Sequence, residues 1–440
     1  MKNINEEHSK YVKLLSFTQG ETAPTNKKLA EDMILQLERF DDNVFKNPNN
    51  TFLDPCAGTG TFGVVLYNKL SQYHTHEWIM KNMIFMVDKS QINCDILERL
   101  RFVNVYKKDF LNEEFNMKFD VVIGNPPYQS STSETNSANA LWVKFGDKVK
   151  DLIKEDGYMA FIHPDSWVNY CETYDNSNKG RMTTKLYRTR VFSVIKPFFV
   201  WIGNSIRTKY FSHVGVDFSI VIGKKTTKKI PITLKHDSNV IIIDNLGKKI
   251  IPKTAKKEII GIFDKLFNNN EKFFKLLQNN NSSFVSDTRK WVHISKEQSQ
   301  QHVYPLCNTS SQYNKGQYLW SSVPHEFQNV SKVIFSDSGY SRPFYDEGVY
   351  GLSSHSFGIE SDLEYSEKVI FYLNSKTLNK ILTYMGNSGA ESQLSVIKNM
   401  IPLINLEKIN LGDESSLVNN ITFLYGLTNE EKEFLLNEKL

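Results

Sequence analysis

The chain has 440 residues, whereas one domain usually takes about 100–200, so the length favours two domains. Hydrophobic residues make up 40% and charged residues 23%, a composition that excludes global disorder and fibrous repeats. The four cysteines form no CxxC pair, which argues against a disulfide scaffold or a zinc knuckle and favours a reducing compartment.

The N-terminal residues are polar, so we expect no signal peptide. The most apolar stretch, residues 191–203, is interrupted by Lys196-Pro197 and is shorter than the ~20 residues that span a bilayer. These features predict a cytoplasmic protein without membrane contact. We expect a monomer, with a dimer as the alternative.

The net charge of +4 hides a strong local concentration of basic residues. Residues 171–250, here called the basic window, hold 15 Lys and Arg against 5 Asp and Glu, a balance of +10. Such a concentration suggests a polyanionic partner. A solvated lysine-rich surface explains it equally well.

Strand-like and helix-like patterns alternate over the first 170 residues. The expected helices are 26–41, 61–73, 90–101 and 138–155, and the expected strands are 51–53, 83–87, 104–106, 119–123 and 158–162. This order predicts an α/β fold with a Rossmann-like doubly wound parallel sheet. Ligands of such sheets bind at the carboxyl ends of the strands.

The pattern changes beyond about residue 225. Short β-rich runs at 240–244 and 332–335 mix with helical runs at 256–267 and 365–384. We therefore expect a first domain over residues 1–225 and a second, α+β domain over residues 226–440.

A glycine-rich segment follows the first expected strand and precedes a helix. It runs Asp54-Pro55-Cys56-Ala57-Gly58-Thr59-Gly60, and its glycines permit a tight turn that approaches a ligand at the helix N-terminus. Asp88 ends the next strand and suits the hydroxyls of a ribose. Asp109-Phe110 could contact an adenine through its amine and its ring face. Each acidic residue alone could equally cap a helix or lie in a surface loop.

The tetrapeptide Asn125-Pro126-Pro127-Tyr128 ends the apolar strand 121–124. The two prolines fix the backbone and remove two donors, which leaves carbonyl groups free. The Asn125 side-chain oxygen and the Pro126 carbonyl could accept both hydrogens of a planar amino group. Tyr128 offers a flat face on which a heterocycle can stack.

In this motif order the sequence resembles the gamma-class, S-adenosylmethionine-dependent N6-adenine DNA methyltransferases with a TaqI-like C-terminal specificity domain. Thr22-Ala23-Pro24 resembles the element that holds the methionine end of the cofactor. The resemblance assigns cofactor contacts to Asp54–Gly60, Asp88, Asp109-Phe110 and Asn125. It assigns catalysis to Asn125–Tyr128. Phe211 resembles the aromatic residue that packs, with Tyr128, against the flipped base. The resemblance covers residues 15–225 and weakens from residue 330 onward.

The resemblance implies methyl transfer to N6 of an adenine flipped out of double-stranded DNA, as in restriction–modification systems, with no metal required. The predicted phosphate contacts come from the basic window: Lys179, Arg181, Lys185, Arg188 and Arg190. Base selection would then belong to the second domain.

Other functions share parts of this pattern. A protein glutamine methyltransferase also presents a planar amide to such a tetrapeptide, but the more than 200 residues after the catalytic half favour DNA. An RNA adenine methyltransferase is a further alternative. A non-enzymatic DNA-binding module and a nicotinamide oxidoreductase are weaker, because neither explains Asn125–Tyr128.

Overall fold

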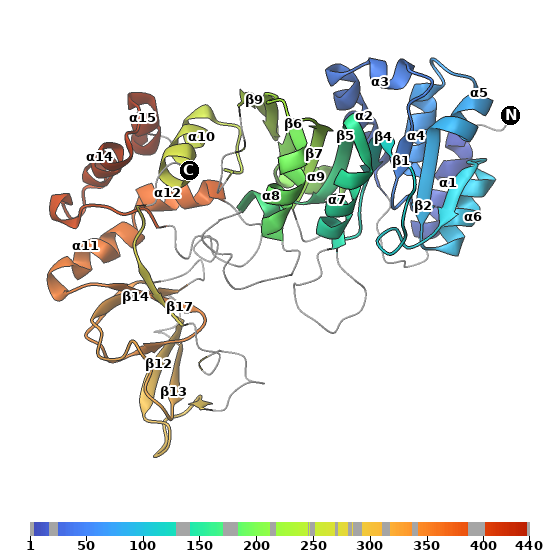
Figure 1. Cartoon of the computed structure of the whole chain (residues 1–440). Helices are drawn as coiled ribbons and strands as arrows, with labels where there is room; N and C mark the ends of the chain where they lie inside the picture. The colour runs from blue at the N-terminus through green and yellow to red at the C-terminus, as the bar shows by residue number, and fades with distance from the viewer. Residues whose placement is uncertain are drawn as a thin grey trace. The chain divides into compact units, whose positions relative to one another are not determined.

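The computed structural model divides the chain into two compact units, Met1–Lys248 and Lys249–Leu440 (Figure 1). It describes residues 4–16, 25–128, 141–169, 184–211, 217–244, 246, 251–268, 272–279, 284, 293–309, 317–336, 342–385 and 401–437. No helix in these ranges is long and apolar enough to cross a bilayer.

The first unit is built on one nine-stranded sheet in the order β3-β2-β1-β4-β5-β7-β6-β8-β9. Its strands are β1 Phe52–Asp54, β2 Ile84–Asp88, β3 Asn104–Lys107, β4 Phe119–Gly124, β5 Ile153–Pro164, β6 Ile195–Ile202, β7 Phe218–Lys225, β8 Ile232–His236 and β9 Asn239–Ile243. The first five strands of this order are parallel, as predicted. β7 is antiparallel to both β5 and β6, so the whole sheet is mixed.

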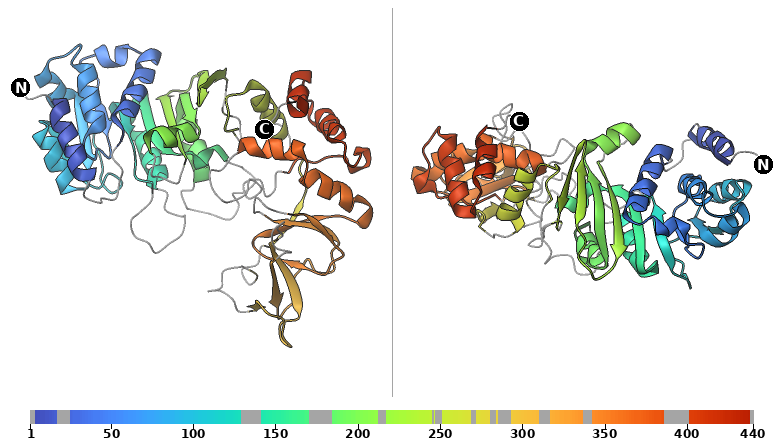
Figure 2. Two further views of the ribbon diagram at one scale, coloured as in Figure 1. Left: turned by 180° about the vertical axis from the view of Figure 1, so that it is seen from behind. Right: turned by 90° about the horizontal axis from the view of Figure 1, so that it is seen from above.

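Helices cover both faces of this sheet (Figure 2). Those of the first unit are α1 Ile4–Ser16, α2 Lys27–Phe40, α3 Asn43–Lys46, α4 Thr61–Leu70, α5 His76–Trp78, α6 Gln91–Arg99, α7 Leu141–Leu152, α8 Thr184–Val194 and α9 Asn204–Tyr210. Helices α2, α4 and α6 share one buried apolar cluster with alternate strand residues such as Phe52, Met86 and Ile123. Helix α7 contacts β5 and α8 from the opposite face. The predicted doubly wound α/β architecture is confirmed.

The unit extends past the predicted boundary at residue 225. β8 pairs in parallel with β6, and β9 pairs with β8, so both strands belong to the large sheet. The chain divides between Lys248 and Lys249 instead. The role predicted for each unit stays a prediction.

The second unit is α+β, with two four-stranded sheets in the orders β10-β17-β14-β15 and β11-β13-β12-β16. Its strands are β10 Leu276–Gln278, β11 Ile294–Ser295, β12 Tyr304–Thr309, β13 Gln317–Ser321, β14 Lys332–Ser336, β15 Phe344–Asp346, β16 Gly351–Leu352 and β17 Ser356–Glu360. Its helices are α10 Lys257–Phe263, α11 Leu363–Leu373, α12 Lys376–Met385, α14 Glu414–Tyr425 and α15 Asn429–Asn437. The first sheet contains a fully buried ion pair, Lys332–Asp346, with Nζ 2.5 Å from Oδ2.

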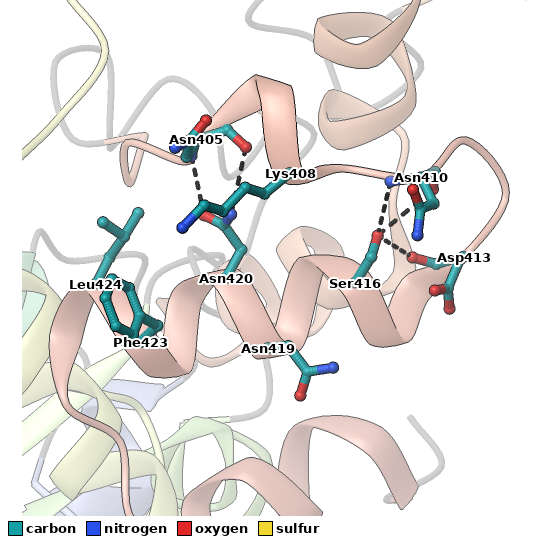
Figure 3. Close-up of a pocket in the computed structure, with 9 residues that line it drawn as sticks. All are labelled: Asn405, Lys408, Asn410, Asp413, Ser416, Asn419, Asn420, Phe423 and Leu424. Carbon is teal, nitrogen blue, oxygen red and sulfur yellow. Dashed lines mark hydrogen bonds between the residues drawn. The ribbon is translucent and has the colours of Figure 1, made fainter.

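A pocket in this unit lies between residues 405–410 and α14, and Figure 3 shows its lining. Its polar groups largely satisfy one another. Asn420 exchanges hydrogen bonds with the backbone of Asn405, and the Ser416 hydroxyl donates to the Asp413 carbonyl. None of the predicted site residues lines this pocket.

Candidate cofactor and substrate site

The sheet order brings the predicted motifs to one edge. β1 lies between β2 and β4, with Asp54 opposite Met86 and Leu53 opposite Val122. Because all three strands are parallel, their carboxyl ends meet at the same edge. The glycine-rich turn, Asp88 and the Asn125–Tyr128 tetrapeptide leave the sheet there.

The turn between β1 and α4 depends on glycine at two positions. Gly58 and Gly60 have φ of +54° and +89°, a left-handed conformation that glycine adopts without strain. A Cβ on Gly60 would lie 2.5 Å from the Leu97 side chain, whereas a Cβ on Gly58 would meet nothing within 4 Å. The turn is fixed by the Ala57 N–H, which donates to the Val87 carbonyl at 2.9 Å. Gly58 therefore borders open space.

Two acidic side chains, Asp54 and Asp88, hold this turn by accepting hydrogen bonds from its backbone N–H groups. Asp54 is 2% exposed and accepts a hydrogen bond from the Cys56 backbone N–H at 3.1 Å. Burial raises the pKa of Asp54 to about 8 despite that bond, and the charge of Asp88 adds to the rise. Asp88 accepts from the backbone N–H groups of Gly58 and Ser90, each at 2.8 Å. Asp88 thus joins the end of β2 to the glycine turn.

The tetrapeptide packs directly on that turn. A Cβ added to Gly124, the last residue of β4, would lie 3.2–3.4 Å from side-chain atoms of Asp54, Pro55 and Cys56. The corner that begins at Asn125 is therefore adjacent to the glycine turn.

The Asn125 side chain is held at both ends. Its Oδ1 accepts from the Tyr128 hydroxyl at 2.6 Å, and its Nδ2 donates to Thr25 Oγ1 at 3.2 Å. Thr25 is not among the predicted site residues. It follows Thr22-Ala23-Pro24, which lie outside the described residues. Asn26, the next residue, caps the N-terminus of α2.

Three aromatic rings continue from the tetrapeptide into the core. The Tyr128 ring packs on Phe218 with centroids 5.2 Å apart, and Phe218 packs on Phe211 at 4.6 Å. Phe211 is only 5% exposed. Phe218 was missed because it opens β7, where the sequence shows only an apolar strand residue.

The pair Asp109-Phe110 follows β3. The Lys108 N–H donates to the Asp88 carbonyl at 3.0 Å, so the pair starts close to the end of β2. Asp109 is exposed and accepts from the Leu111 N–H at 3.0 Å, as in a capped turn. Phe110 is 2% exposed and stacks on Phe145 at 5.1 Å. The Phe110 ring therefore already packs on another aromatic ring of the core.

The predicted phosphate contacts divide into three groups. Lys179 and Arg181 lie outside the described residues, and the structure places Lys185 in α8 without describing its side chain. Arg188 is 8% exposed and donates to the Leu246 carbonyl at 2.9 Å, so its predicted contact with DNA is withdrawn. Arg190 is exposed and pairs with Asp147 at 3.6 Å.

The described ranges contain no candidate metal centre: no three His, Cys, Asp or Glu side chains gather there in a way that could hold a metal ion. The acidic side chains of the site are instead Asp54 and Asp88, which bind backbone N–H groups of the turn.

Comparison with known proteins finds related sequences over part of the chain. Residues 64–193 match the model of the Eco57I restriction-modification methylase family. The type II methyltransferase M.VspI of Vibrio sp. (strain 343) is 24% identical over 165 residues, 34% of this chain and 38% of that protein. An uncharacterized adenine-specific methylase of Mycoplasma pneumoniae is 49% identical over 55 residues, 12% of this chain and 13% of that protein. The chain thus spans less than two fifths of either relative.

A solved structure shares the fold over most of the chain. The type IIL restriction-modification enzyme MmeI, solved in complex with DNA, aligns with a TM-score of 0.51 and 12% identity. The alignment covers 93% of this chain and 71% of that one. At this identity the likeness establishes a common fold.

Proposed function

We propose that this chain is an S-adenosylmethionine-dependent methyltransferase that modifies N6 of adenine in double-stranded DNA. The observation that carries the proposal is the packing of the Asn125–Tyr128 corner on the Asp54–Gly60 turn. The match of residues 64–193 to a restriction-modification methylase family supports it, because the matched range includes the tetrapeptide.

The residues of the turn fit the cofactor. Open space borders Gly58, and the Asp88 carboxylate stands beside it at the end of β2, where ribose hydroxyls are bound in folds of this type. Both Asp88 oxygens already accept hydrogen bonds, but a carboxylate has lone pairs for more. When bound, S-adenosylmethionine would supply an electrophilic methyl group. Asp54 keeps the turn in place through the Cys56 N–H.

Asn125 and Pro126 would hold the target nitrogen. The Asn125 oxygen accepts from the Tyr128 hydroxyl and retains a second lone pair. The Pro126 carbonyl supplies the second acceptor. Two acceptors on one amino group would draw the nitrogen lone-pair density out of conjugation with the ring and direct it toward the methyl donor. The chain would thus contribute mainly position and polarisation.

The aromatic row would capture the base. An adenine paired in a duplex hides its amine, so the base must leave the stack at a cost of a few kcal/mol. Tyr128 is partly exposed and rests on Phe218, so its ring is supported from behind. Phe211 is buried, so a contact with the base would require it to move. Target recognition by the second unit belongs to the same proposal.

The test is a methyl-acceptor assay with tritiated S-adenosylmethionine. The three acceptors are adenine-containing duplex DNA, RNA of the same sequence and a release-factor protein with an accessible glutamine. We expect label in DNA only, recovered as N6-methyladenine after digestion to nucleosides. Label confined to RNA or to protein would replace this proposal by one of the two alternatives. Absence of transfer to all three acceptors would overturn it.

A further inference from the structure

A second pocket lies in the first unit, between α2 and the antiparallel strands of the large sheet. Trp201 of β6 stands opposite Ile220 of β7 and Lys235 of β8, so the three side chains form one wall. Helix α2 contributes Asp32 and Arg39. The volume is about 220 Å³, below the roughly 300–1,000 Å³ of pockets that enclose drug-sized ligands. A small group fits better than a whole nucleotide.

The lining carries an excess of positive charge. Arg39, Lys209 and Lys235 contribute three cations against the one carboxylate of Asp32. That carboxylate is already engaged, because it pairs with Lys28 at 3.1 Å and accepts from the Tyr210 hydroxyl at 2.9 Å. Over the described residues, none of the three cations forms an ion pair with a carboxylate.

Several other described cations of the basic window bind acidic residues or backbone carbonyls of the same unit. Arg207 pairs with Asp217 at 3.1 Å, Lys224 with Asp156 at 3.0 Å, and Lys225 with Glu155 at 3.3 Å. Lys196 of β6 donates to the Phe192 and Ser193 carbonyls at the end of α8, and Arg188 and Arg190 are engaged as described above. Of the described cations of this window, Lys209 and Lys235 line the concave site together with Arg39.

The wall also contains an unsatisfied donor. Trp201 is 6% exposed, and its indole N–H has no hydrogen-bond acceptor. A buried donor without a partner costs stability, and an acceptor brought within hydrogen-bond distance of it would remove that cost. The Lys235 ammonium stands 3.7 Å from the centroid of the same ring. Burial lowers the pKa of Lys235, which shows that its charge is only partly solvated.

We propose that this pocket binds a phosphate group, and that in the working protein it is a phosphodiester of the DNA backbone. This assignment rests on the proposed function. The position of helix α9 supports this assignment. The helix carries Lys209, which lines the pocket, and ends immediately before Phe211. Phe211 packs on Phe218, the ring that lies behind Tyr128. A phosphate held here would fix the DNA strand relative to the base-capturing rings without reading its sequence.

The DNA arm of the test compares two double variants of the full chain. Lys209→Gln/Lys235→Gln removes two pocket charges, and Lys228→Gln/Lys229→Gln removes two charges from the exposed turn before β8. Affinity for a duplex is measured by fluorescence anisotropy over a salt series. We expect the pocket variant to bind about 5–50-fold more weakly and to reduce the salt slope by about 1–2, with less than about 2-fold change in the control.

The phosphate arm uses the Trp201 indole resonance in ¹⁵N–¹H spectra, assigned by its loss in Trp201→Phe. We expect inorganic phosphate and a short oligonucleotide to shift it in the wild type but not in Lys209→Gln/Lys235→Gln. A shift with phosphate alone would overturn the DNA assignment and leave a free phosphate as the ligand. Absence of any shift, or equal DNA affinity in the two double variants, would overturn the pocket proposal.

The two proposals fail separately. If the wild type methylates DNA but the pocket variant binds DNA as tightly as the control variant, only the pocket proposal is overturned. If the pocket variant binds DNA more weakly than the control variant but the wild type transfers no methyl group, only the proposed function is overturned.

Discussion

The two halves of the nine-stranded sheet place chemical groups in different ways. In the parallel half, β3 to β5, groups far apart in sequence meet because every strand delivers its carboxyl end to one edge; Asp54, Asp88 and Asn125 meet in this way. In the other half, here called the antiparallel half, three of the four strand pairings are antiparallel, while β8 runs parallel to β6. The strands there do not all end at one edge, and groups meet across a face, as Trp201 and Lys235 do.

The difference shows which charges are available for binding. At the parallel edge the carboxylates bind backbone N–H groups, so they shape a turn. On the antiparallel side Arg207, Lys224 and Lys225 pair with acidic residues of the same unit. Among the described cations of that side without such partners, Lys209 and Lys235 line the hollow that a helix and three strands leave.

The strongest test of the parallel edge is Asn125→Ala. Loss of the side-chain acceptor should lower kcat for methyl transfer by about 10²–10³-fold, because it removes a polarising contact with the target nitrogen. Cofactor affinity, measured by calorimetry, should change little. Tyr128→Phe is the matched control: it keeps the ring, loses the 2.6 Å bond to Asn125, and should cost less than about 10-fold. Wild-type turnover in Asn125→Ala would refute the assigned chemistry.

Two glycines of the same turn, Gly58 and Gly60, should differ in how much each stabilises the fold. Gly60→Ala should lower the free energy of unfolding by about 2–4 kcal/mol, since a left-handed φ is combined with a Cβ only 2.5 Å from Leu97. Gly58→Ala also has positive φ but open space, so about 1–2 kcal/mol is expected. Urea denaturation followed by circular dichroism measures both. Equal losses would show that the packing against Leu97 is unimportant.

The raised pKa of Asp54 predicts a pH dependence. Its folded pKa of about 8 lies above the ordinary value, so the folded chain binds the proton more tightly than the unfolded chain. The unfolding free energy should therefore fall as pH rises from about 4 to about 8. The change should be about 2 kcal/mol between pH 6 and 7.5. Asp54→Asn should lack this component. A variant with the wild-type pH profile would show that Asp54 ionises normally.

Next to the antiparallel half, two arginines of α8 should behave differently. Arg188→Met removes the buried bond to the Leu246 carbonyl and should cost about 1–2 kcal/mol of stability. Arg190→Gln breaks an ion pair whose arginine is half exposed and should stay within about 0.5 kcal/mol. Thermal denaturation of both variants provides the measurement. A larger loss of stability for Arg190→Gln than for Arg188→Met would contradict the assignment of Arg188 as the buried, structural arginine.

Much of the parallel half was predictable from the sequence. The strands predicted at 51–53, 83–87, 104–106 and 119–123 agree with β1 to β4 to within about one residue, because short apolar runs between turns mark buried strands clearly. The helix predicted to reach residue 155 ends at Leu152 instead, and β5 begins at Ile153. Local pattern does not show that pairing with β4 starts so early.

The antiparallel half was less predictable, for reasons of long-range contact. Nothing near residue 232 indicates that β8 joins a sheet through β6, so the boundary was placed too early. Arg188 looks like its neighbours in sequence but is buried by the fold. Thr25 and Phe218 gain their places only through partners about 100 and 90 residues away, Asn125 and Tyr128.

The hydrogen bonds of Asn125 have a consequence for the order of events. Tyr128 and Thr25 hold the amide in one orientation through hydrogen bonds within the chain itself. The rotational freedom of that side chain is thus given up during folding, and an arriving amine meets a preorganised acceptor.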